Sequence, residues 1–270
     1  MKRWFISCAV LLMGIFLAGN SLSATYDATG EWDITASAHW NNCGESNPGT
    51  EQSVGIIIQN GDNFTIIMND RTITGTVSGN VYTATDKWYE DEGWTTGTFT
   101  VTASSSTQAS GSVDWTWSDG VDSCSGGNQL SMTRRAQNPP TYDATGTWNY
   151  SDSDHWNNCG EPNEPPSSGT ATLTQSGNRI TLVGDPQETY YGFVNGPNYT
   201  FARSYPEDNG ITSEVYRVTL VSGGTSGSGT GNWVWNDDYG MCTGGFNFSI
   251  LKQEEKVKSI PGIPLLLLDD

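Results

Sequence analysis

Basic residues and long apolar runs are both scarce in this chain. Its 270 residues include 12 Lys+Arg against 30 Asp+Glu, which gives a net charge of −18 at pH 7. A protein of this charge repels phosphate backbones and anionic membrane surfaces, so we expect no nucleic-acid partner. Outside the N-terminal region no segment approaches the ~20 consecutive apolar residues of a transmembrane helix, so we expect no transmembrane span.

Catalytic motifs are also missing. The chain has only two histidines and contains no Gly-x-Ser-x-Gly, His-Glu-x-x-His or Gly-rich phosphate-binding signature. The sequence therefore lacks the motifs of nucleophilic and metal-dependent hydrolases. A carboxylate pair such as Glu45 and Asp119 is the type that cleaves glycosides, but acidic residues are too abundant for one pair to stand out. We therefore expect no enzyme, with a glycan-active enzyme as the least favoured alternative.

The first 24 residues are typical of a secretory signal peptide. Lys2 and Arg3 precede an apolar stretch from Trp4 to Ala18, and small or polar residues follow up to Ala24. We expect cleavage near Ala24 and an exported protein that is extracellular, on the cell surface or periplasmic.

The remainder contains an internal repeat. The string Thr-Tyr-Asp-Ala-Thr-Gly-x-Trp begins at Thr25 and again at Thr141, and His-Trp-Asn-Asn-Cys-Gly-Glu begins at His39 and again at His155. Both strings recur at the same spacing, which indicates two copies of one module.

The repeat divides the chain into five parts. These parts are a signal peptide (1–24), module one (25–135), a short stiff linker (136–140), module two (141–253) and a tail with an apolar Ile-Pro-Leu-rich end (254–270).

Each module is predicted to be all-β, because turn residues separate alternating apolar runs at intervals of roughly 8 to 12 residues. The strands predicted in module one are 31–40, 52–60, 63–68, 72–77, 81–85, 98–103, 111–117 and 128–133. Tight connections between successive strands make them a sequential meander.

The cysteines test this topology. Four remain after the signal peptide, and export makes disulfides their expected state. Of the three connectivities we favour Cys43–Cys124 and Cys159–Cys242, which give each module its own bridge. Cys43 follows the first predicted strand and Cys124 precedes the eighth, so they meet when strand eight closes on strand one. We therefore predict two tandem eight-stranded antiparallel up-and-down barrels, with β-sandwich modules as the alternative.

The start of each module resembles a known group of proteins. Gly-Glu-Trp at Gly30 and Gly-Thr-Trp at Gly146 are similar to the Gly-x-Trp opening of the first strand in the calyx-shaped barrels of lipocalins, avidins and fatty-acid-binding proteins. The resemblance implies a small apolar or amphiphilic ligand inside the barrel. Inward-facing Tyr82, Phe99 and Trp115 are large enough to fill a small barrel, so a filled interior is the alternative.

Comparison of the copies also predicts an apolar surface. Ile56 and Ile58 align with Thr172 and Thr174, so they should point outward as an exposed contact patch. The apolar tail from Ile260 to Leu268 is expected either to bind a protein partner or to dock on such a patch.

The odd-numbered connections of module one gather aromatic and acidic residues at one end. The ligand-binding residues predicted there are Trp40, Glu45, Trp88, Tyr89, Trp94 and Asp119. Rings beside carboxylates suit a sugar, whose C–H faces stack on them. Clustered carboxylates are also the ligands of Ca²⁺, but no Asp-x-Asp-x-Asp-Gly loop is present, so we expect no metal site and no cofactor, with Ca²⁺ as the alternative.

These observations predict a secreted, non-enzymatic protein that binds a glycan or a small amphiphilic ligand. The alternative is an extracellular structural or assembly scaffold without a small ligand. Module two carries Tyr205 to Asn209 in place of the Trp-rich loop, so module one is expected to bind and module two to act as a spacer.

Overall fold

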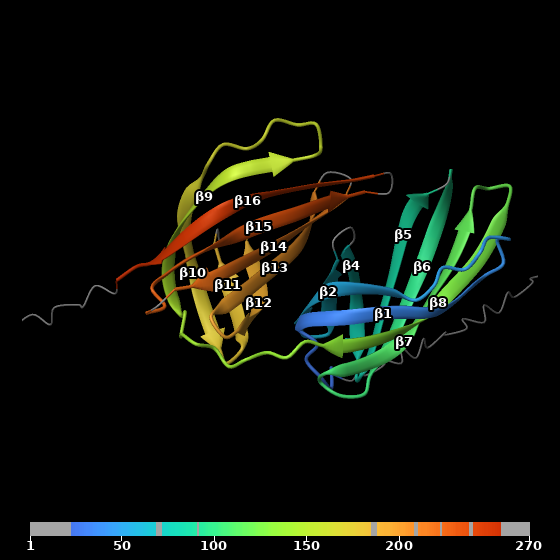
Figure 1. Ribbon diagram of the computed structural model, residues 1–270, viewed down its shortest axis with the longest axis horizontal. Helices are drawn as coiled ribbons and strands as arrows, with labels where there is room; N and C mark the ends of the chain where they lie inside the picture. Colours follow the sequence, from blue (N-terminus) through green and yellow to red (C-terminus); the bar gives the residue numbers. More distant parts are fainter. Residues whose placement is uncertain are drawn as a thin grey trace, which may run out of the picture.

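A computed structural model shows two closed β-barrels joined by a short connection (Figure 1). The structure describes residues 23–68, 72–90, 92–184, 188–207, 210–221, 223–237 and 240–254. Nearly all of the predicted signal peptide and the tail segment Ile260 to Leu268 lie outside the described residues. Within these ranges the regular elements are all β-strands, and no helix is long and apolar enough to cross a membrane.

The first barrel follows the chain from β1 to β8, and β8 pairs with β1 to close it. Its strands are β1 (Gly30–Asn41), β2 (Glu51–Asn60), β3 (Asn63–Ile67), β4 (Thr72–Ser78), β5 (Val81–Glu90), β6 (Gly93–Ala103), β7 (Gln108–Ser118) and β8 (Ser123–Arg134). All neighbouring pairs are antiparallel.

The second barrel repeats this order, and β16 closes on β9. Its strands are β9 (Gly146–Asn157), β10 (Ser168–Ser176), β11 (Arg179–Val183), β12 (Thr189–Asn195), β13 (Asn198–Glu207), β14 (Gly210–Leu220), β15 (Ser226–Asn236) and β16 (Met241–Lys252). The predicted pair of eight-stranded antiparallel barrels is confirmed, and the sandwich alternative is wrong.

One predicted loop of module one is a strand hairpin. The predicted strands ended at 85 and resumed at 98, which left 86–96 as a connection, yet β5 continues to Glu90 and β6 begins at Gly93. Its residues pair in register, with Asp86 opposite Gly97 and Tyr89 opposite Trp94. Aromatic residues alternating with polar ones satisfy a strand with one face inside the barrel, so the charges do not break it.

Each barrel carries its own disulfide, as predicted. Cys43 bonds to Cys124 and Cys159 to Cys242, with 5.1 Å between the Cα atoms in both cases. Each bridge joins the segment after the first strand to the start of the last one. In the chain-entropy picture, closing loops of this length contributes about 4 kcal/mol each to the free energy of unfolding.

The segment before each first strand closes one end of its barrel. In the first barrel Trp32 Nε1 donates to the carbonyl oxygen of Ala28 at 2.7 Å, and Gln59 Oε1 accepts from the Ala28 backbone N–H at 2.9 Å. The same contacts recur around Trp148 and Gln175 in the second barrel. The repeated Gly-x-Trp string therefore has a structural role, because its indole anchors this plug.

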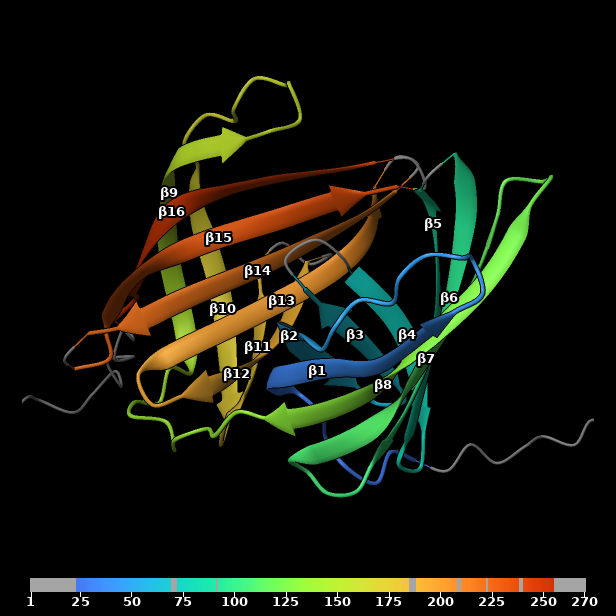
Figure 2. The same ribbon diagram turned by 45° about the vertical axis from the view of Figure 1, so that its right-hand side comes forward.

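The two barrels pack against each other through their outer faces (Figure 2). The apolar interface cluster consists of Ile56, Ile58 and Ile67 from the first barrel and Tyr191, Phe193, Ala202 and Val215 from the second. Ile56 and Ile58 point outward as predicted, but they are only 3% and 7% exposed because the second barrel covers them. The expectation that this patch is exposed is therefore wrong, and it offers no open surface for the tail.

Polar contacts surround the interface cluster. Arg179 of the second barrel pairs with Asp27 of the first at 2.9 Å and donates to the Gln59 carbonyl oxygen at 3.0 Å. Arg217 lies 3.5 Å from Glu31. Basic residues of the second barrel thus face acidic residues of the first, which favours one relative orientation of the two.

Candidate functional site

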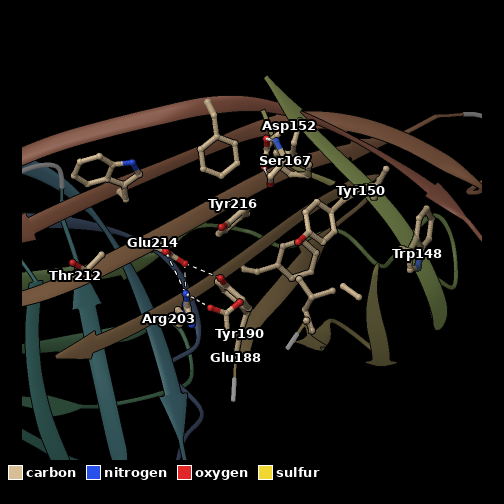
Figure 3. Close-up of a pocket in the computed structure, with 18 of the residues that line it drawn as sticks. Trp148, Tyr150, Asp152, Ser167, Glu188, Tyr190, Arg203, Thr212, Glu214 and Tyr216 are labelled. Atoms are coloured by element: carbon tan, nitrogen blue, oxygen red, sulfur yellow. Dashed lines mark hydrogen bonds and ion pairs between the residues drawn. The ribbon is translucent and has the colours of Figure 1, made fainter. Parts of the chain in front are cut away.

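A cavity of about 490 Å³ occupies the second barrel (Figure 3). Its mouth lies at the end of the barrel where β9, β11 and β13 finish, and Glu164, Glu188 and Glu207 border it there. The rings that line it include Trp148, Tyr190, Phe201, Tyr216, Phe246 and Phe248. A cavity of this size with many aromatic residues and a few polar groups in its wall is typical of a small-molecule site.

The first barrel has almost no comparable space. The gap enclosed by its core residues is about 20 Å³, smaller than a water molecule needs to move in freely, and Phe64, Tyr82, Phe99 and Met132 border it. The filled-interior alternative therefore describes the first barrel, while the second is hollow. Among the described residues, the small gap in the first barrel does not support the expectation that module one is the binder and module two the spacer.

The two interiors differ at one cross-strand position. In the first barrel Asp86 lies opposite Gly97, and the Trp88 ring comes within 3.1 Å of where a Cβ atom on residue 97 would sit. The indole therefore covers the glycine and fills the interior. At the equivalent position of the second barrel Arg203 lies opposite Glu214, and the Glu214 side chain occupies the space that Gly97 leaves open.

Arg203 and Glu214 are the centre of a hydrogen-bond network in the cavity wall (Figure 3). The guanidinium donates from Nε to Glu214 Oε2 at 2.9 Å and from Nη2 to Glu188 Oε1 at 3.0 Å. The hydroxyls of Tyr190 and Tyr205 donate to the two Glu214 oxygens at 2.7 and 3.1 Å. Both oxygens of Glu214 are therefore fully engaged.

Aromatic rings complete the surroundings of this arginine. Its guanidinium carbon lies 4.7 Å from the centroid of the Tyr190 ring and 4.3 Å from that of Tyr205. Burial alone would lower the pKa of Arg203, but the hydrogen bonds and negative charge of Glu214 outweigh it and raise the pKa. Burial raises the pKa of Tyr205 and Tyr216, and Glu214 adds to the effect. These phenols stay protonated as donors at neutral pH.

A second polar group lies in the cavity wall near the mouth. Asp152 accepts from Ser167 Oγ at 2.6 Å and lies 3.0 Å from His155 Nε2, while the imidazole stacks on Phe246 at 5.0 Å. The serine hydroxyl bonds to the carboxylate and not to the imidazole. This arrangement differs from a catalytic triad, in which the histidine takes the serine proton. Asp152, Ser167 and His155 therefore have a structural role, in which the carboxylate holds the other two side chains together.

The six ligand-binding residues predicted in module one do not converge on one pocket. Trp88 points into the first barrel and packs on Gly97. Tyr89 and Trp94 lie together on the outer face at 5.3 Å between ring centroids, and Lys87 Nζ is 4.1 Å from the Trp94 centroid.

The other three predicted residues lie at the open end and on the surface. Trp40 is 48% exposed. Glu45 is exposed, and its carbonyl oxygen accepts from Asn41 Nδ2 at 3.3 Å. Asp119 accepts from the backbone N–H groups of Val121 and Asp122, which lowers its pKa and stabilises the turn. A binding role for the six residues stays a prediction.

The cavity residues of module two were missed, although the sequence carries a signal for them. Arg203 lies two residues after Phe201, and Glu214 lies two before Tyr216, so both charges share the inward face with core aromatics. Two opposite charges on inward positions of neighbouring strands predict a buried ion pair. Comparison with the uncharged Gly97 in the first copy would have marked the site.

Among the described residues, no three His, Cys, Asp or Glu side chains gather in a way that could hold a metal ion. The sequence matches no family model, and a search of the curated proteins finds no relative.

Proposed function

We propose that this chain is an exported, non-enzymatic binding protein that takes up a small amphiphilic ligand in the cavity of its second barrel. The observation that carries the proposal is the cavity of about 490 Å³, whose wall combines aromatic rings with polar groups. An amphiphile fits such a site, because its apolar body removes ring surface from water while its polar end meets the Arg203–Glu214 network.

Two further features support this proposal. The closed eight-stranded barrels and the Gly-x-Trp opening resemble those of the calyx-shaped group that includes lipocalins, in which ligands occupy the barrel interior. The two disulfides suit an oxidising compartment outside the cytoplasm, in agreement with the predicted signal peptide.

The first barrel has a different proposed role. Its interior is filled, and its Ile56 and Ile58 cover the outer face of strands that carry Tyr190 and Arg203 on their inner side. It therefore supports the wall of the cavity from outside. This assigns the scaffold function to module one within the same chain.

The proposal is tested on the full chain with N-phenyl-1-naphthylamine, a neutral probe that fluoresces in apolar surroundings. We expect one bound probe per chain. Ala171 lines the cavity, and the variant A171W places an indole there that fills it. The control T172W places the same side chain on the exposed face of the same strand. A171W should abolish binding and T172W should retain it.

Glycans are tested by displacement of the same probe. A glycan that displaces it from the wild type would place the ligand among sugars with an apolar face. Absence of probe binding in the wild type, with a folded second barrel by circular dichroism, would refute the proposed function and leave a scaffold.

A further inference from the structure

The charges around the cavity are strongly unbalanced. Five carboxylates line it, whereas the cationic side chain among the described lining residues is Arg203. The carboxylates belong to Asp152, Glu164, Glu188, Glu207 and Glu214. The five carboxylates and Arg203 together leave four negative charges in excess, which favours a negative electrostatic potential in the cavity.

Arg203 does not offer a site for an anion. Its Nε and Nη2 atoms are already bonded to Glu214 and Glu188, and two tyrosine rings cover its faces. An incoming carboxylate or phosphate would find these two donors occupied and would lie beside several carboxylates. Within a partly buried site such like-charge contact is strongly unfavourable.

The protein itself shows how this interior accommodates a positive charge. Arg203 is held as an internal cation, with its side chain only 16% exposed, between carboxylates and the faces of Tyr190 and Tyr205. The rings of Tyr216, Phe246 and Phe248 also line the cavity. Aromatic faces beside excess negative charge are the environment that binds organic ammonium ions.

We infer that the ligand of the second barrel is an organic cation, an amine or quaternary ammonium attached to an apolar body, attracted by the excess carboxylates of the cavity and packed against its rings. This inference rests on the proposed binding function and specifies its ligand class. The apolar body would lie between these rings, and the ammonium would face the side of the cavity that carries Glu188 and Glu207.

The test compares three probes that share a phenyl-alkyl body. They are phenethyltrimethylammonium, its neutral carbon isostere (3,3-dimethylbutyl)benzene and the anion 4-phenylbutyrate. Each displaces N-phenyl-1-naphthylamine from the full chain. The cation should bind about tenfold more tightly than the neutral isostere, because cation–π and charge attraction add to the same apolar contact. The anion should bind more weakly than both.

A charge-neutralising variant sharpens the comparison. E188Q removes a carboxylate at the mouth and should weaken the cation about threefold, the size typical of an exposed ion pair. Because Glu188 also accepts from Arg203, the neutral probe is measured on the same variant, and its affinity should fall less than that of the cation. E51Q makes the same change on an exposed residue of the first barrel and should leave all three probes unchanged. Thermal unfolding of both variants checks that they remain folded.

The outcomes separate the two proposals. Equal or tighter binding of the neutral isostere, or tightest binding of the anion, would overturn the cation inference and leave the binding function intact. Failure of every probe, including N-phenyl-1-naphthylamine, would overturn the binding function itself.

Discussion

The two barrels share a frame and differ in their interiors. Both have the same strand order, a disulfide between equivalent residues and a Trp-anchored plug at one end. Inside, Trp88 covers Gly97 in the first barrel, whereas Arg203 and Glu214 face a cavity in the second. The features that close a barrel are therefore separate from those that decide whether it is hollow, so one copy can serve as a support while the other acquires a site.

The largest expected effect tests what the barrels share. Replacing both cysteines of one bridge by serine should cost about 4 kcal/mol of the free energy of unfolding in either barrel, because the bridged residues are 81 and 83 positions apart and chain entropy depends on loop length. The measurement is chemical denaturation of C43S/C124S and of C159S/C242S. If the two losses differed by more than about 2 kcal/mol, the interior of each barrel and not the length of the closed loop would determine how much a disulfide stabilises it.

A core truncation tests what the barrels do not share. W88A should cost about 3 kcal/mol, since it removes the ring that fills the first barrel and leaves a void. That void should also let a second molecule of N-phenyl-1-naphthylamine bind per chain. The control Y89A changes the neighbouring residue on the outer face, which is 40% exposed, and should cost far less. Unchanged stability of W88A would instead assign Trp88 to a binding surface.

Most of the frame could be predicted from the sequence. The repeated strings located both copies, and the cysteine positions selected a closed barrel, because only closure of β8 on β1 brings Cys43 beside Cys124. The strand limits were harder to predict, since the predicted strands left 86–96 as a connection. The strand continues because Lys87 and Tyr89 point outward while Trp88 fills the interior, an arrangement that depends on the neighbouring strand.

The cavity could not be predicted in the same way. Aromatic residues are abundant in both modules, and whether a ring fills the interior depends on its neighbour across the strand, as Trp88 and Gly97 show. The contact between the two barrels could not be predicted either. The outward direction of Ile56 and Ile58 was readable, but the surface that covers them belongs to the other barrel and arises only from the three-dimensional packing.

An interface variant tests whether the barrels depend on each other. I58D places a carboxylate in the apolar interface cluster and should cost about 2 kcal/mol, because the charge is desolvated without a partner. We expect the barrels to separate, with a larger radius of gyration by small-angle scattering and faster proteolysis at 136–140. T174D changes the equivalent, exposed position of the second barrel, and it should change neither the radius of gyration nor the rate of proteolysis. A compact I58D chain would mean that the polar contacts alone hold the orientation.

The smallest expected effect concerns the pH dependence of the second barrel. Burial alone would raise the pKa of Asp152, but hydrogen bonds from Ser167 and His155 outweigh burial and lower it. A carboxyl with a lowered folded pKa stabilises the protein above its unfolded pKa of about 4 and loses that stabilisation as the pH falls through the folded value. The first barrel has Ala36 at this position, and His39 Nε2 is buried there with no hydrogen-bond partner in the described part of the chain.

D152A, which introduces the residue of the first barrel, should therefore cost about 1 kcal/mol at pH 7, and the difference from the wild type should vanish toward pH 2. S167A removes the hydroxyl donor but leaves the backbone N–H of residue 167 and His155 as partners of the carboxylate, so it should give a smaller loss with the same pH dependence. Denaturation between pH 2 and pH 7 measures both. A D152A deficit that persists unchanged at pH 2 would show that Asp152 stabilises the barrel by packing, and that its charge does not distinguish the two copies.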